Sequence, residues 1–113
     1  MTVALDFTPA DVRVTVTQGD VLREITLTCT LEDGSPWNLS DVKDAQVRRR
    51  HARSSEVVLS VPAAVAGNVV TLGPVAIPAD PGAWWWDCEV SDADGALTVI
   101  AGPFRILEDI SNA

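Results

Sequence analysis

The clearest structural pattern in this chain reads Gly82-Ala83-Trp84-Trp85-Trp86-Asp87-Cys88-Glu89-Val90, then Ser91-Asp92-Ala93-Asp94-Gly95, then Ala96-Leu97-Thr98-Val99-Ile100. An aromatic run, a turn that ends in Asp-Gly and a second run with β-branched residues are typical of a β-hairpin. The first run contains three of the four tryptophans of the chain. We therefore expect a hairpin whose tryptophans belong either to a large core or to a docking surface.

Alternation along the first strand of this hairpin separates the tryptophans. Successive side chains of a strand point to opposite faces, so one face carries Trp84, Trp86, Cys88 and Val90, and the other carries Trp85, Asp87, Glu89 and Ser91. Trp84 and Trp86 are expected in the core, where each buries roughly 200 Å². Trp85 shares a face with carboxylates and is expected to be partly exposed. It is either an anchor for a partner or a ring lying flat over its neighbours.

Short β-type segments also cover the rest of the chain. Predicted strands lie at 12–17, 21–32, 45–52, 57–61, 68–72, 75–77 and 104–107, separated by turns rich in Gly, Pro and Asp. Residues 63–66 could form one helical turn, too short to matter. This pattern predicts an all-β fold, an antiparallel β-sandwich of about seven strands.

Length and charge limit the organisation and the partners. The 113 residues fit one domain, with an N-terminal arm at 1–11, the sandwich at 12–109 and a C-terminal tail at 110–113. A net charge of −8 argues against nucleic acid and anionic membranes as partners. The start lacks a basic, apolar leader, and no run of about 20 apolar residues occurs, so we expect neither secretion nor membrane insertion.

Two cysteines are predicted to point inward. Cys29 lies on the core face of the alternating segment Ile25–Leu31, and Cys88 lies on the core face of the aromatic strand. They form either a disulfide between the sheets or two buried thiols, the default in a reducing cytoplasm. Inward thiols without a CxxC pair predict no metal site. The string Asp92–Gly95 lacks the further ligands of a calcium loop and is expected to be a turn.

A basic cluster stands out in this acidic chain. It comprises Lys43, Arg48, Arg49, Arg50 and Arg53 beside His51, the only histidine. The cluster is either a solvated strand end and loop, or a surface that docks onto an acidic patch of a neighbouring subunit, copies of this chain included. Nucleic acid is disfavoured because no aromatic residues are interleaved. Since the positive surroundings of His51 oppose an imidazolium, we expect no catalytic triad, no cofactor and no enzymatic activity.

The motifs and their order resemble a known family. The hairpin, the closing Ala101-Gly102-Pro103-Phe104-Arg105-Ile106, an early Gln18-Gly19-Asp20, the segment Ile25–Leu31 and Asp33-Gly34-Ser35-Pro36-Trp37-Asn38-Leu39 together resemble small tailed-bacteriophage and prophage virion proteins. These share an immunoglobulin-like sandwich related to the N-terminal domain of baseplate upper proteins. The resemblance covers roughly residues 12 to 109. Tryptophans at 84 and 86 replace tyrosines of that pattern, and cysteines at 29 and 88 replace aliphatic residues.

The resemblance implies an immunoglobulin-like sandwich that requires no disulfide, carries no catalytic residue and acts as a structural protein of the virion. Such a protein assembles in the host cytoplasm in multiple copies, at the tail, baseplate, connector or head surface, by contacts with other virion proteins and with itself. The candidate interface residues are Trp85, Trp37, Arg48, Arg50 and Arg53. The alternative is a carbohydrate-binding or host-adhesion module that stacks sugars on Trp37 and Trp85, although Trp37 also fits a cap on the end of the core.

Overall fold

The protein is a β-sandwich without helices in the residues that the computed structural model describes, which are 1–5, 8–50, 52, 54–77 and 80–109. Its strands are β1 (Thr2–Ala4), β2 (Ala10–Asp11), β3 (Val14–Thr17), β4 (Val21–Leu22), β5 (Ile25–Thr30), β6 (Asp41–Arg48), β7 (Val57–Ser60), β8 (Ala63–Ala66), β9 (Val69–Leu72), β10 (Val75–Ala76), β11 (Gly82–Asp92) and β12 (Gly95–Leu107). The predicted all-β sandwich is confirmed.

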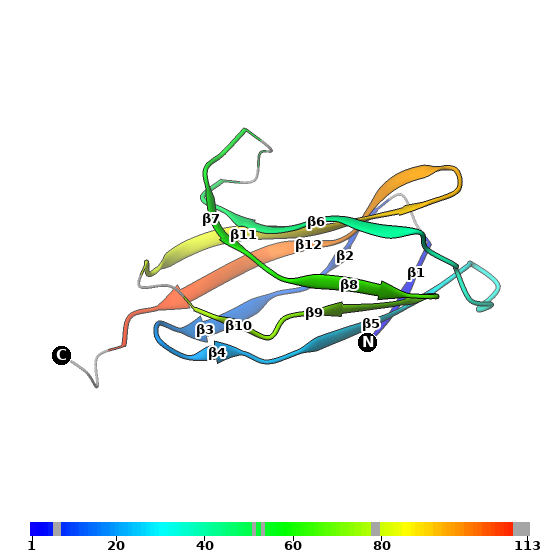
Figure 1. Cartoon of the computed structure of the whole chain (residues 1–113). Coiled ribbons are helices and arrows are strands. Elements are labelled where there is room, and N and C mark those ends of the chain that lie inside the picture. The colour runs from blue at the N-terminus through cyan, green and yellow to red at the C-terminus, as the bar shows by residue number, and fades with distance from the viewer. Residues whose placement is uncertain (6–7, 51, 53, 78–79, 110–113) are drawn as a thin grey trace.

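Two layers face each other across the core (Figure 1). One layer is a sheet with the order β2-β12-β11-β6-β7, in which β3 also pairs with β12. The other is a sheet with the order β1-β5-β9-β8, accompanied by the short pair β10-β4. The long hairpin β11–β12 forms the centre of the first layer, and its turn lies at one end of the elongated molecule.

The N-terminal residues predicted as an arm contribute strands to both layers. β1 runs parallel to β5, with Val3 opposite Cys29, and Val3 is buried. β2 and β3 run parallel to β12. These pairings supply partners for backbone groups that β5 and β12 would otherwise leave unpaired at a sheet edge. The antiparallel prediction therefore holds for the rest of the sandwich but not for its N-terminal strands.

Two local predictions differ from the structure. Residues 63–66 form β8 instead of a helical turn, because they pair antiparallel with β9 over its whole length. The strand predicted at 45–52 is β6, at Asp41–Arg48, and so begins and ends earlier than expected. It begins earlier because its pairing with β11 extends to Ser91, close to the turn of the long hairpin. The strand number exceeds seven because short N-terminal strands are added and Pro and Gly interrupt the segments between 60 and 77.

The core lies between the layers. Of the two tryptophans predicted to lie in it, only Trp86 is fully buried. Trp86 is 2% exposed, meets Phe104 edge-on with ring centroids 5.5 Å apart, and donates its indole N–H to the Val12 carbonyl at 2.9 Å. Trp84 is only half-buried, because it lies near the start of β11, where the layers end. The core prediction is confirmed for Trp86 and holds only in part for Trp84.

Both cysteines are completely buried, and neither forms a disulfide. Their predicted inward orientation is confirmed, and the structure contains two thiols instead of a disulfide. Burial raises the pKa of the Cys29 thiol, which keeps it protonated. The cysteines thus act as small apolar residues of the core.

Candidate docking site

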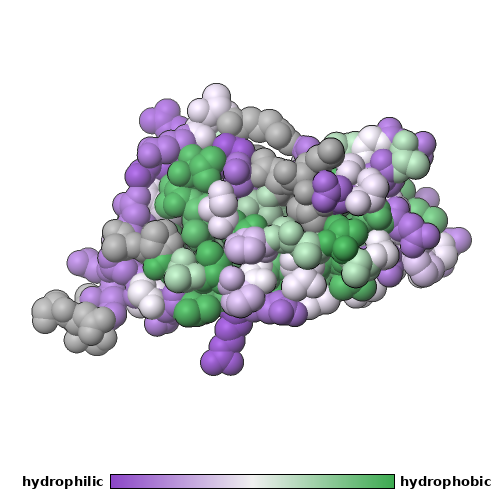
Figure 2. Space-filling view, viewed as in Figure 1, coloured by the Kyte–Doolittle hydropathy of each residue, from purple (hydrophilic) through white to green (hydrophobic). Residues whose placement is uncertain are grey.

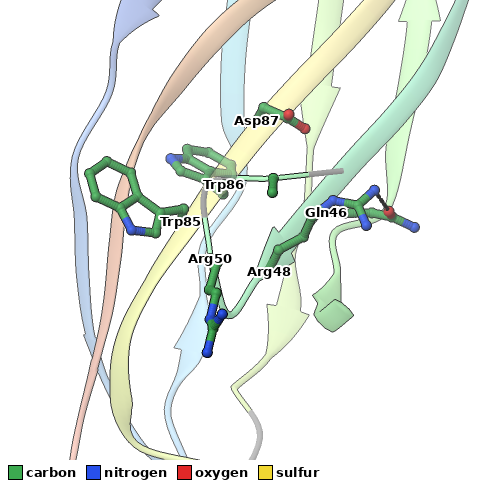
Figure 3. Close-up of a pocket in the computed structure, with 7 residues that line it drawn as sticks. Gln46, Arg48, Arg50, Trp85, Trp86 and Asp87 are labelled. Carbon is green, nitrogen blue, oxygen red and sulfur yellow. Dashed lines mark hydrogen bonds between the residues drawn. The ribbon is translucent and has the colours of Figure 1, made fainter. Parts of the chain in front are cut away.

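Three of the predicted interface residues meet at one hollow of about 180 Å³. Its lining residues are Gln46, Arg48, Arg50, Ala52, Trp85, Trp86 and Asp87. Figure 3 shows Trp85 on one side, Gln46 and Arg48 on the other, and Arg50 between them. At about 30 Å³ per water molecule, this volume accommodates roughly six waters, or one or two small side chains.

Strand register explains why these residues meet. On the outer face of the layer, Trp85 of β11 lies directly opposite Arg48 of β6, and Asp87 lies opposite Gln46. Paired residues in neighbouring strands have Cβ atoms about 5 Å apart. Alternation identified Trp85 and Asp87 as sharing a face, but Gln46 was missed, because alternation alone does not reveal which strand pairs with β11 or in which register.

The turn after β6 adds Arg50. Its backbone N–H donates to the Ser55 hydroxyl at 2.9 Å, which fixes this turn. Arg48 donates to the Gln46 side-chain oxygen at 2.5 Å and to the Ser55 carbonyl at 3.4 Å. Arg48 is thereby held half-buried at the hollow, whereas Arg50 is exposed and its guanidinium makes no hydrogen bond or ion pair with the described residues.

The aromatic ring completes the chemistry of the hollow. Trp85 is 38% exposed, so its predicted exposure is confirmed. A guanidinium binds a carboxylate through charge-assisted hydrogen bonds, and an indole offers apolar area beside it. Two arginines outnumber Asp87, the one carboxylate of the lining, so the hollow suits a short segment that carries a carboxylate next to small apolar groups.

Arg49 has a different role from its neighbours. It forms ion pairs of 2.7 Å with both Glu56 and Asp80, and its guanidinium lies 4.8 Å from the centre of the Trp84 ring. The hydrogen bond that Arg49 donates to Glu56 is the main cause that raises the pKa of Arg49. The basic cluster is thus divided between a structural residue, Arg49, and the residues of the hollow. Arg53 and His51 lie outside the described residues.

Trp37 does not belong to this site. It is 4% exposed and lies near the other end of β11, where its indole N–H donates to Asp92 Oδ2 at 2.8 Å. Burial leaves Trp37 little surface for a partner or a stacked sugar, and its prediction as a cap on the core is confirmed. A buried indole needs a partner for its N–H, and the adjacent hairpin turn supplies one.

The turn of the hairpin is built on Asp92. Its Oδ1 accepts hydrogen bonds from the backbone N–H groups of Asp94, at 2.8 Å, and Gly95, at 3.1 Å. These bonds and the one from Trp37 hold the pKa of Asp92 below its usual value, with Trp37 as the largest cause. The predicted turn is confirmed, and no group of three or more potential metal ligands occurs in the described part of the chain.

A second hollow of about 680 Å³ lies beside this turn. Leu5, Trp37 and Leu97 contribute apolar lining, while Glu32 and Asp94 are among its charged residues. Sequence reasoning missed it, because its walls come from the N-terminal segment, the turn after β5 and the hairpin, which are far apart in the chain.

Comparison with known proteins does not extend these observations. The sequence matches no model of a protein family, and no curated protein has a significantly similar sequence. Within the described residues, the structure contains no helix that is long and apolar enough to span a membrane.

Proposed function

We propose that this protein is a non-enzymatic structural component of a bacteriophage virion, assembled in multiple copies through protein–protein contacts at the hollow formed by Trp85, Arg48 and Arg50. The phage assignment rests on the sequence resemblance described above. The observation that supports a docking role is the position of an exposed tryptophan beside two arginines on a rigid sheet.

Such an arrangement has the composition of an interface anchor. Tryptophan and arginine are the residues that most often dominate binding energy in protein interfaces, and neighbouring strands hold Trp85 and Arg48 in a fixed register. An acidic segment of a neighbouring virion protein is the partner that this charge favours. The interface is small, and the many symmetric copies of a virion would multiply its strength by avidity.

The carbohydrate-binding alternative has less support. It required two exposed tryptophans, and burial of Trp37 leaves only Trp85 as a stacking ring. One exposed indole beside arginines still matches an acidic sugar, so glycan binding is an outcome that the same variants can reveal. Loss of glycan binding in Trp85→Ala would favour this alternative.

The direct experiment measures incorporation into particles. Phage that lacks the gene is complemented with wild type, Trp85→Ala, Arg50→Glu or the matched control Arg23→Glu, whose exposed arginine lies outside the hollow. We expect all four proteins to fold alike, and the two hollow variants alone to be depleted from purified virions. Absence of the wild-type protein from virions would refute the proposed function, and normal incorporation of both hollow variants would refute this site.

A further inference from the structure

The two ends of the hairpin differ in charge. The hollow lies near the start of β11, and the turn Asp92–Gly95 lies beyond its end, about 23 Å from Trp85 at 3.3 Å per residue. Figure 1 shows this turn projecting at one end of the molecule, next to the turn that follows β5. The exposed charges of these two turns, Glu32, Asp33 and Asp94, are all negative.

One side of the molecule contains little charge in its middle. Between Glu56 and Asp80 the chain has no charged residue, and this segment supplies β7 to β10. In Figure 2, pale and green residues occupy the middle of the visible face, while strongly hydrophilic residues gather toward its ends and lower margin. An electrostatic contact between copies is therefore not expected on this side, whereas the turn at the end of the hairpin carries exposed charge.

We infer that the hollow binds the hairpin turn of a second copy of this chain, with Asp94 directed at Arg50 and Arg48. This inference rests on the proposed docking function of the hollow and names its partner. Asp94 is the suitable carboxylate because it is exposed, whereas the Asp92 carboxylate is engaged by Trp37 and by the turn. The adjacent Ala93 and Gly95 are small and exposed, so the turn can enter a hollow of about 180 Å³ beside Trp85.

Such a contact is head-to-tail. The turn of one copy occupies the hollow of the next, which leaves a vacant turn and a vacant hollow at the two ends of every assembly unless a ring closes. Successive hollows along such an assembly would lie about as far apart as the hollow and the turn of one copy, about 23 Å. Because a single turn in a single hollow is smaller than a standard interface of about 800 Å² per partner, the association is expected to be weak and sensitive to salt.

A charge exchange tests the inference. Arg50→Glu alters the hollow, and Asp94→Arg alters the turn, so each variant alone sets like charges against each other, whereas a mixture of the two offers one original and one exchanged pair. Sedimentation velocity over a concentration series, at low and high salt, measures association. The matched controls are Arg23→Glu and Glu108→Arg, which change the same charges at exposed positions outside the hollow and the turn.

We expect the wild type and both controls to associate at low salt and to dissociate at high salt. Each variant alone should bind about tenfold more weakly, and an equimolar mixture should regain the wild-type behaviour. A monomeric wild type at every concentration, or a mixture no better than the single variants, would overturn the inference. If Arg50→Glu is nevertheless depleted from virions, the docking function holds and the hollow binds a different virion protein.

Discussion

The two ends of the β11–β12 hairpin place tryptophans in opposite situations. At the turn end, Trp37 is buried and its N–H is bonded to Asp92, which also holds the turn. At the other end, Trp85 is exposed and the guanidinium of Arg50 has no bond among the described residues. Polar groups satisfied within the chain stabilise the fold, whereas charged and aromatic groups left at the surface are available to a partner.

The largest expected difference between the two ends concerns stability. Trp37→Ala should reduce the free energy of unfolding by about 3–5 kcal/mol, because it leaves a cavity in the core. Trp85→Ala should cost less, about 1–2 kcal/mol, because 38% of Trp85 is exposed and its removal opens no closed cavity in the core. Urea denaturation followed by circular dichroism measures both. Equal losses in the two variants would show that Trp85 is as important to the fold as Trp37.

A second, smaller difference separates two neighbouring arginines at the Trp85 end. Arg49→Gln removes the pairs with Glu56 and Asp80 and the contact with Trp84, so its melting temperature should fall. Arg50→Gln removes no bond within the described chain and should melt like the wild type. The loss for Arg49→Gln should shrink in high salt, since its partners are partly exposed. A loss in Arg50→Gln as large as that in Arg49→Gln would contradict the distinction.

Much of the fold could be predicted from local patterns. Strict alternation in β5 placed Leu27 and Cys29 inside, and the Asp-Gly turn marked the long hairpin. The parallel pairing of β1 with β5 was not predictable, because the three residues of β1 show no distinct pattern and are placed by the edge that they cover and by the burial of Val3. β8 was missed for a similar reason: an alanine-rich segment has little strand preference of its own and depends on β9.

The candidate site was predictable in part. Alternation correctly separated Trp85 from Trp86, since exposure follows from the face alone. The pattern left Trp37 open between the surface and the core, because its burial depends on Asp92, 55 positions along the chain, which provides a hydrogen-bond acceptor. Charge clustering identified Arg48, Arg49 and Arg50. It could not show that Arg49 is structural whereas the other two line the hollow, because that distinction depends on the partners Glu56 and Asp80.

The smallest expected effect concerns acid and the turn end of the hairpin. The hydrogen bonds from Trp37, Asp94 and Gly95 hold the pKa of Asp92 below its usual value, about 3.9 for aspartate in an unfolded chain. Between the folded and unfolded pKa values, the unfolded state binds more protons, so stability rises with pH in that range. The contribution of Asp92 is therefore present above the unfolded pKa and disappears as the pH falls through the folded pKa.

Asp92→Asn isolates this contribution, because asparagine keeps an oxygen acceptor but does not titrate. Urea midpoints between about pH 2 and pH 5 should fall less steeply in this variant than in the wild type. Asp33, whose pKa the Ser35 hydroxyl also lowers, is present in both proteins, so its contribution cancels in the comparison. Asp94→Asn serves as the control for a carboxylate of the same turn. Identical slopes in wild type and Asp92→Asn would mean that folding does not lower the pKa of Asp92, so that the bonds from Trp37 and the turn do not favour its charged form.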